Sequence, residues 1–243
     1  MQNSEIIKSQ IQIAKQCFGN NINELEHNSL IYRRHAQEQV DRHLSFVYPV
    51  LKKQLGNEIW LLSIDELIST VLYKGSLEVV FIELVQKNSE NYKSYLADLA
   101  KYEMGLYRLL LFPSIKTLDY IRVGDVLLDS PVLNPVNELL YLKYPVHTSQ
   151  NLLGREYEQE VRLLIFRRES DYMIDFIELT PIEYYILSRY TTSTLSFRDL
   201  LIDTSQLFQI KNFLSMEILA AKFVFDLLKR EAILGFTNKG FIG

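Results

Sequence analysis

The sequence predicts an α+β protein, with an N-terminal all-α helical bundle followed by a smaller C-terminal domain that contains an antiparallel β-sheet and helices. Apolar residues recur at helical spacings through most of residues 1–111, they alternate with polar residues from Asn137, and helical spacing returns after Thr180. We therefore expect a bundle over 1–111, a connector over 112–135 and a strand-plus-helix domain over 136–243. A chain of 243 residues is long enough for two such domains.

Turn-forming residues divide the bundle into separate helical segments. Pro49 falls inside the second segment and should kink or restart the helix there, because proline removes a backbone donor and clashes with the preceding turn. Gly56 suits the end of that segment, and Ser76 is a suitable cap for a later one. The expected helices cover residues 5–18, 30–55, 58–73, 76–86 and 91–111.

The C-terminal domain begins with strands and continues with helices. Pro145 makes the first strand an edge strand, since proline cannot donate to a sheet. Thr180 and Pro181 start the first helix, and Gly235 is expected to stop the last one. The expected strands are 137–146, 160–168 and 172–179, and the expected helices run from Pro181 to near Tyr190, from Thr194 or Ser196 to Ile202, and over 212–233.

Charge and cysteine content exclude several classes of protein. Lys and Arg total 26 and Asp and Glu total 30, whereas domains that grip nucleic acid usually carry a basic surface. Cys17 is the single cysteine, so neither an internal disulfide nor a cysteine-based zinc site is expected. No signal peptide is visible, and no apolar run approaches the length of a membrane span. We therefore expect a soluble, cytoplasmic protein with no membrane partner.

Known motifs of catalysis and cofactor binding are missing from the sequence. The four histidines form no HExxH pair, and the glycines form neither a phosphate-binding loop nor a GxSxG elbow. We expect no catalytic residue, no metal ligand and no cofactor. Two basic clusters are candidate contacts with an acidic partner, namely Arg33-Arg34-His35 in the bundle and Arg162 with Arg167-Arg168 around the second strand.

Several blocks of sequence resemble a bacterial family. The blocks in the bundle are Ile31-Tyr32-Arg33-Arg34-His35, Tyr48-Pro49-Val50-Leu51, Leu55-Gly56-Asn57-Glu58 and Tyr95-Leu96-Ala97-Asp98-Leu99-Ala100-Lys101-Tyr102-Glu103, and a weaker one is Leu142-Lys143-Tyr144-Pro145-Val146-His147. With their spacing, they resemble the HvfC/BufC-type family, which carries the label of a DNA-binding domain and is related in role to the methanobactin partner protein MbnC.

The resemblance implies a non-catalytic partner protein. Members of that family pair with multinuclear non-haem iron oxidases, which modify cysteines in ribosomally made precursor peptides. The partner helps to hold the leader of the precursor, and the iron with its ligands belongs to the oxidase. The C-terminal domain also resembles small winged-helix-like modules of such pathways, in which a β-hairpin precedes three helices. An exposed sheet edge of this kind can accept an extended peptide as an added strand.

Two sets of residues follow from these arguments. The candidates for contact with the partner or the peptide lie in the two basic clusters and on the second strand, and they are Arg33, Arg34, His35, Arg162, Leu164, Phe166 and Arg168. The residues of the family blocks are expected to be structural, with Gly56 as a helix stop and Asp98 as a tie between helices. These residues are Tyr32, Tyr48, Pro49, Gly56, Leu96, Asp98, Tyr102 and Glu103.

A DNA-binding transcription regulator is the alternative, because a winged-helix-like unit also binds DNA in other proteins. A recognition helix normally presents several basic or amide side chains to the groove. The candidate helix, residues 196–204, offers Arg198 with Asp199 and Asp203 beside it, which argues against DNA. An enzyme of unknown type is the third reading, and a metal or cofactor bound to the purified protein would favour it.

Overall fold

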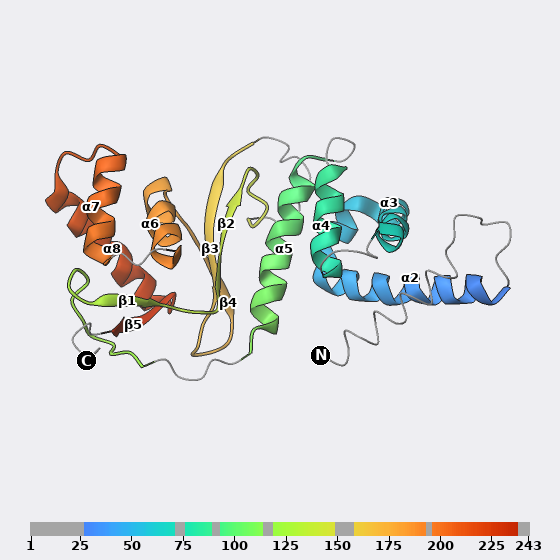
Figure 1. The fold of residues 1–243 in the computed structure, drawn as a ribbon, viewed down its shortest axis with the longest axis horizontal. Helices are drawn as coiled ribbons and strands as arrows, with labels where there is room; N and C mark the ends of the chain where they lie inside the picture. The colour runs from blue at the N-terminus through green and yellow to red at the C-terminus, as the bar shows by residue number, and fades with distance from the viewer. Residues whose placement is uncertain are drawn as a thin grey trace. The chain divides into compact units, whose positions relative to one another are not determined.

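The computed structural model describes residues 27–70, 76–88, 93–113, 119–148, 158–192 and 196–237. Within these ranges the chain is an α+β protein, with helices in its N-terminal part and two small antiparallel sheets in its C-terminal half, as predicted (Figure 1). Unit 1 lies within Met1–Met104 and Val146–Glu156, and unit 2 lies within Gly105–Pro145 and Tyr157–Gly243. The units are groups of residues that contact one another more than they contact the rest of the chain. The two domains expected on either side of a connector at 112–135 therefore stay a prediction.

Unit 1 is built from helices. The break between its first two helices confirms the interruption predicted at Pro49, which starts the second because a proline at the first helical position sacrifices no hydrogen bond. Gly56 has φ 76° and ψ 165°, a conformation that favours glycine, so the predicted stop is a kink inside this helix. The segment predicted over 5–18 lies outside the described residues. The helices are α2 (His27–Val47), α3 (Pro49–Thr70), α4 (Leu77–Lys87) and the first part of α5 (Tyr95–Leu111).

An aromatic cluster holds α2, α3 and α4 together. Trp60 and Tyr48 each pack on Phe81 with ring centroids 5.3 Å apart, and all three side chains are fully buried. The indole N–H of Trp60 donates to Asp41 at 2.7 Å, and the ammonium group of Lys52 donates to the same carboxylate oxygen at 2.7 Å. The half-buried carboxylate of Asp41 therefore satisfies the N–H donor of a buried indole, which would otherwise cost free energy.

A three-stranded antiparallel sheet organises unit 2, in the order β2-β3-β4 (Figure 1). Its strands are β2 (Asn137–Leu142), β3 (Val161–Arg167) and β4 (Ile174–Glu178), each inside its predicted range. Strand β3 pairs on both sides, with Leu163 opposite Leu140 on β2 and opposite Glu178 on β4. A central strand covered on both faces carries a continuous apolar run, which explains the buried segment of β3.

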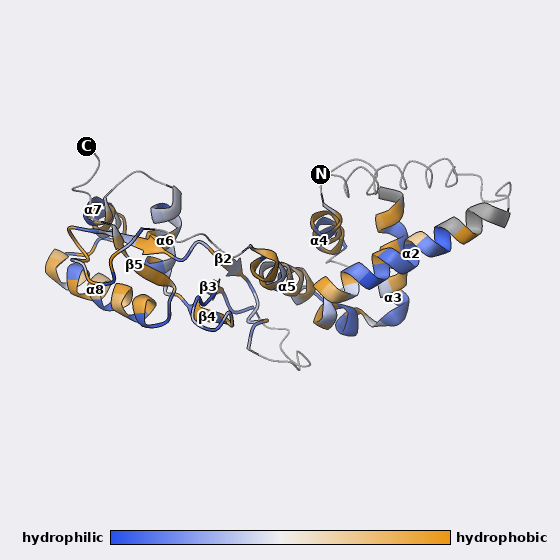
Figure 2. Cartoon of the chain, turned by 90° about the horizontal axis from the view of Figure 1, so that it is seen from below, coloured by the Kyte–Doolittle hydropathy of each residue, from blue (hydrophilic) through white to orange (hydrophobic). Residues whose placement is uncertain are grey.

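Three helices of unit 2 follow this sheet, namely α6 (Pro181–Thr192), α7 (Phe197–Leu207) and α8 (Phe213–Lys229). The order of a hairpin and three helices is the one that the sequence predicted. Helix α8 is mostly apolar, and its apolar side chains are not confined to the side that faces the core (Figure 2). One side packs into the core of unit 2. The other side leaves Leu214, Ile218, Leu219 and Phe225 exposed. Among the described residues, no helix is long and apolar enough to cross a membrane.

The end of the chain differs from the prediction of one helix over 212–233. Helix α8 ends at Lys229, and Ile233–Thr237 forms β5, which pairs antiparallel with β1 (Ser130–Leu133). Glu231 turns the chain with a φ of 63°. Gly235 was expected to stop the helix, but it lies within β5, where a Cβ atom would collide with the backbone of Ile121. The predicted helix therefore overran its end, and its last residue, Ile233, pairs with Leu133 of β1 instead.

The last part of α5 belongs to unit 2 and packs on its sheet. A Cβ atom at Gly105 would lie 2.8 Å from Cδ1 of Ile165 on β3, so glycine permits this close approach. The guanidinium of Arg167 donates to the carbonyl oxygens of Leu109 at 2.9 Å and of Phe112 at 2.8 Å. Arg167 thus satisfies carbonyl groups that a helix leaves without partners at its C-terminus.

Candidate functional site

A groove opens in unit 2 beside the outer edge of β4. It has a volume of ≈ 430 Å³ and is lined by residues from β4, from the start of α6 and from the end of α8. The lining residues are Ile177, Glu178, Glu183, Phe223, Asp226, Leu227, Lys229 and Arg230. We call this feature the β4 groove.

The β4 groove combines apolar and charged side chains. Ile177, Phe223 and Leu227 supply apolar surface that continues into the core of unit 2. Three carboxylates and two basic side chains surround this surface, so the charged groups are acidic on balance. A pocket that mixes apolar surface with a few charged groups is a candidate site for a ligand.

A capping box fixes Glu183 at the start of α6. The Thr180 backbone N–H donates to Glu183 at 2.8 Å, and the Glu183 backbone N–H donates to the Thr180 hydroxyl at 3.3 Å. The backbone N–H groups of Thr180 and Glu183 thereby both have hydrogen-bond acceptors. The sequence Thr-Pro-Ile-Glu predicted this helix start. The two hydrogen bonds between Thr180 and Glu183 hold the Glu183 carboxylate in place in the β4 groove.

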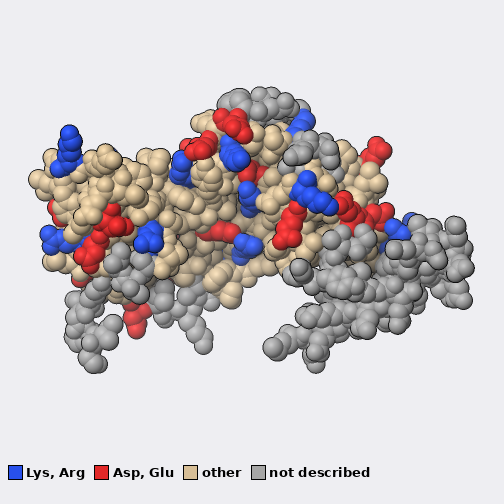
Figure 3. Space-filling view, turned by 45° about the horizontal axis from the view of Figure 1, so that its top comes forward, with Lys and Arg blue, Asp and Glu red and all other residues tan. Residues whose placement is uncertain are grey.

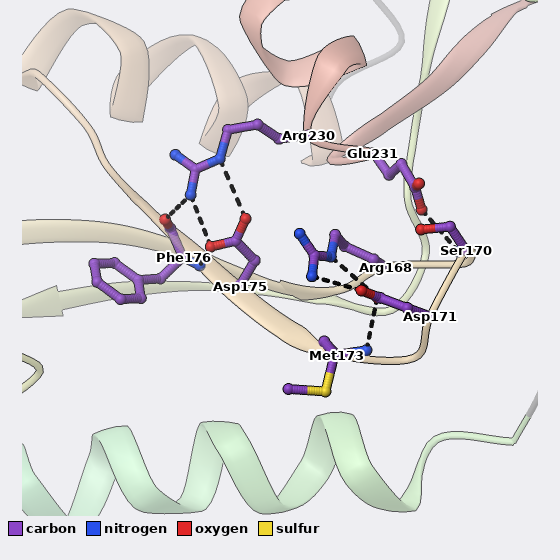
Figure 4. Close-up of polar contacts among 8 residues, drawn as sticks. All are labelled: Arg168, Ser170, Asp171, Met173, Asp175, Phe176, Arg230 and Glu231. Carbon is purple, nitrogen blue, oxygen red and sulfur yellow. Dashed lines mark hydrogen bonds and ion pairs between the residues drawn. The ribbon is translucent and has the colours of Figure 1, made fainter.

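Arg230 joins the end of α8 to the edge of β4 (Figure 4). Its Nη2 donates to Asp175 at 2.7 Å and its Nε to the other oxygen of this carboxylate at 3.2 Å. The same Nη2 also donates to the carbonyl oxygen of Phe176 at 2.6 Å. A planar guanidinium suits this arrangement, because it offers several donors in a rigid fork.

A second ion pair lies in the turn between β3 and β4 (Figure 4). Arg168 contacts Asp171 at 2.6 Å, and Asp171 accepts the backbone N–H of Met173 at 3.0 Å. The hydrogen bond from Met173 and the charge of Arg168 lower the pKa of Asp171. The backbone N–H of Ser170 donates to Glu231 at 2.9 Å, which ties this turn to the residue after α8.

The candidate contact residues of β3 have different surroundings. Leu164 and Phe166 are 0 % exposed in the core of unit 2, so neither can contact a partner in this structure, and both are core residues instead. The reason is the position of β3 as the central strand. Arg162 lies 5.2 Å from the ring centre of Tyr141 and donates to Glu160 at 2.8 Å. Arg168 is part of the turn just described.

The basic cluster of the bundle lies on α2. Arg33 pairs with Asp65 at 3.1 Å and Arg34 pairs with Glu38 at 3.2 Å, whereas His35 is exposed. The pair between Arg33 and Asp65 joins α2 to α3, and the pair between Arg34 and Glu38 lies along α2. This cluster and the β4 groove are in different units.

Most residues of the family blocks make contacts within unit 1. Tyr48 donates its hydroxyl to the carbonyl oxygen of Glu78 at 2.8 Å. Asp98 is buried and pairs with Lys101 at 3.1 Å. Tyr102 contacts the ring of His147, and burial raises the pKa of its hydroxyl. Leu96 is buried, and Pro49 starts α3 while Gly56 kinks it. The side chain of Tyr32 is not among the described side chains.

Glu103 has the most unusual surroundings of the block residues. Its two carboxylate oxygens accept the backbone N–H groups of Val50 at 2.8 Å and Leu51 at 2.9 Å, in the first turn of α3. Burial raises the pKa of Glu103 to about 7, although these hydrogen bonds act in the opposite direction. The carboxylate therefore caps α3 across 52 positions of sequence, in the manner of an N-cap.

Asp175 and the groove residues of α8 were not among the predicted site residues. One signal was available, because Asp226, Lys229 and Arg230 crowd charge at the end of an apolar helix. Because the helix was predicted to continue to Ile233, these charged residues were not recognised as its end. A helix ending at Lys229 places Arg230 at its C-cap, where a basic side chain is favoured.

Among the described residues, no group of three or more His, Cys, Asp or Glu side chains is placed to hold a metal ion. Comparison with models of known protein families and with curated proteins finds no match.

Proposed function

We propose that this chain is a non-catalytic partner protein that binds an iron-dependent peptide-modifying oxidase and its ribosomally made precursor peptide. The observation that carries the proposal is the β4 groove, which offers apolar surface and charged side chains beside a sheet edge. The family-like blocks of unit 1 supply the expected type of partner. In this proposal the oxidase supplies the iron and the reaction, and this chain supplies the binding surface.

The chemistry of the β4 groove favours a peptide with apolar residues and a basic residue. Arg230 is engaged by Asp175, and Lys229 lies 4.0 Å from Asp226 with 77 % of its side chain exposed. Glu178 and Glu183 add further negative charge to the same lining. A basic side chain of the peptide therefore meets an acidic surface, and its apolar neighbours cover Ile177 and Phe223.

Surface charge gives the DNA-binding alternative little support. On the face shown in Figure 3, acidic and basic side chains of the described residues are interspersed, without one continuous basic area. In α7, Arg198 lies 4.0 Å from Glu217. Binding to a phosphate backbone depends on basic side chains that neutralise phosphates. The proposal therefore favours a protein and a peptide as partners.

Co-expression tests the proposal. The full chain is produced with a non-haem iron oxidase and a short cysteine-containing peptide encoded beside it. Co-purification of the three, with peptide modification that depends on this chain, supports the proposal. If the oxidase does not co-purify and modifies the peptide equally well without this chain, the proposal fails. Salt-sensitive binding of the purified chain to DNA supports the alternative regulator.

A charge reversal locates the peptide site. Asp226→Arg changes an exposed carboxylate of the β4 groove, and we expect about a tenfold weaker affinity for the peptide, the size of a lost charge-assisted contact. Asp119→Arg changes an exposed carboxylate of unit 2 outside the groove lining and serves as the matched control. Fluorescence anisotropy of a labelled peptide measures both affinities. Equal affinities for the two variants contradict this location of the site.

A further inference from the structure

The outer edge of β4 is defined by its pairing with β3. The Leu179 backbone N–H donates to the Arg162 carbonyl at 2.8 Å, and the Arg168 backbone N–H donates to the Met173 carbonyl at 2.9 Å. Backbone groups alternate in direction along an antiparallel strand, so the even-numbered residues of β4 direct theirs away from β3. Phe176 is the central residue of this outward-facing set.

Both outward-facing backbone groups of Phe176 are occupied by side chains of unit 2 (Figure 4). Its N–H donates to the carboxylate of Asp175 at 2.8 Å, and its carbonyl oxygen accepts from Arg230 at 2.6 Å. The two side chains also form a bidentate ion pair with each other. The middle of the edge therefore has the hydrogen bonds that another strand would offer.

The anchor of this arrangement is the end of α8. Arg230 is the C-cap residue of that helix, and α8 is held by core side chains such as Phe223 and Leu227. The guanidinium is therefore delivered to β4 by a packed helix rather than by a loop. The neighbouring ion pair of Arg168 and Asp171 lies in the turn before β4, and its hydrogen bonds do not involve the Phe176 carbonyl.

A β-strand at the edge of a sheet can pair with the edge of another molecule, and folded proteins avoid this with charged or covering groups. We propose that Arg230 and Asp175 lock the outer edge of β4, so that it does not pair with β4 of a second copy of this chain. Such pairing would be symmetric, with each Phe176 close to the two-fold axis. The proposal does not depend on the proposed function, because it concerns the purified chain alone.

Removal of both side chains tests the lock. Asp175→Ala with Arg230→Ala removes the groups that occupy both outward-facing backbone groups of Phe176, and for this double variant we expect an average mass that rises with concentration to about twice the wild-type value, since two edges pair in a symmetric dimer. Arg168→Ala with Asp171→Ala removes the neighbouring ion pair and should keep the wild-type mass at every concentration. Analytical ultracentrifugation gives the masses, and circular dichroism confirms that each variant is folded.

A second variant separates an opened edge from a general loss of stability. Ile174 is the first residue of β4 and directs its N–H outward, so Ile174→Pro costs no bond to β3 and blocks strand addition. Adding Ile174→Pro to the double variant Asp175→Ala with Arg230→Ala should restore the wild-type mass. The lock is disproved if the double variant is folded and keeps the wild-type mass, or if the triple variant associates as strongly as the double variant.

Discussion

The two units of the chain place their charged side chains in opposite ways. In unit 1 a carboxylate enters the interior, where Glu103 is 5 % exposed and caps the start of α3. In unit 2 the charges that tie elements together are half-buried arginines, with Arg167 at the end of α5 and Arg230 at the edge of β4. Unit 1 therefore contains a buried group whose protonation is coupled to folding, whereas the arginines that tie unit 2 together stay charged.

We expect the largest loss of stability from a substitution in the core of unit 2. Phe166→Ala removes a fully buried ring from β3 and should lower the free energy of unfolding by about 3–5 kcal/mol, because a cavity remains. Urea denaturation followed by circular dichroism measures this loss. Phe225→Ala removes an exposed ring from α8 and should change the same quantity by less than about 1 kcal/mol. Similar losses for the two variants would contradict the assignment of Phe166 to the core.

The next effect concerns the pH dependence of unit 1. The pKa of Glu103 is raised from 4.5 to about 7, so the folded chain holds this proton more tightly than the unfolded chain does. Its contribution is fully present below pH 4.5 and is lost as the pH rises to about 7, which lowers the free energy of unfolding by about 3 kcal/mol. Urea denaturation of the full chain at a series of pH values across this window measures the loss.

Glu103→Gln should flatten this pH dependence, because an amide does not titrate and still offers an oxygen to one of the two backbone donors. Glu38→Gln replaces an exposed carboxylate of α2 and serves as the control that keeps the wild-type profile. The assignment to Glu103 fails if Glu103→Gln retains the full slope.

We expect the smallest losses of stability from substitutions of two neighbouring arginines in unit 2. Arg167→Ala leaves carbonyl groups of α5 without their charged donor and should cost about 1–3 kcal/mol of stability. Arg168→Ala breaks a partly exposed ion pair with Asp171 and should cost about 0–1 kcal/mol. Thermal or urea denaturation ranks the two variants. Equal costs would show that Arg167 acts as an ordinary surface charge and not as a helix cap.

Local patterns predicted most of the elements. The interruption at Pro49, the kink at Gly56 and the start of α6 at Pro181 follow from backbone chemistry that acts within a few residues. The three strands of the main sheet lie inside their predicted ranges for the same reason. The family-like blocks also drew attention to Glu103, although nothing in the sequence indicated which donors it accepts.

The residues that the sequence misplaced depend on pairing between distant segments. Apolar spacing extended the predicted helix to Ile233, and only pairing with β1, about a hundred positions earlier, makes residues 233–237 a strand. Leu164 and Phe166 were candidate contact residues on the second predicted strand, as part of a sheet expected to accept a peptide. The order β2-β3-β4 places them at the centre of the sheet and buries them.

The sequence by itself determined the fold class, the order of helices and strands and the balance of charge, because these depend on composition and short-range spacing. Only the tertiary structure decided that Glu103 caps α3 and that Arg230 meets Asp175, since each pair is separated by more than 50 positions. Hydrogen bonds of this kind form only after packing has brought the helix ends and the strand edge together. The β4 groove and the lock on its edge are consequences of that packing.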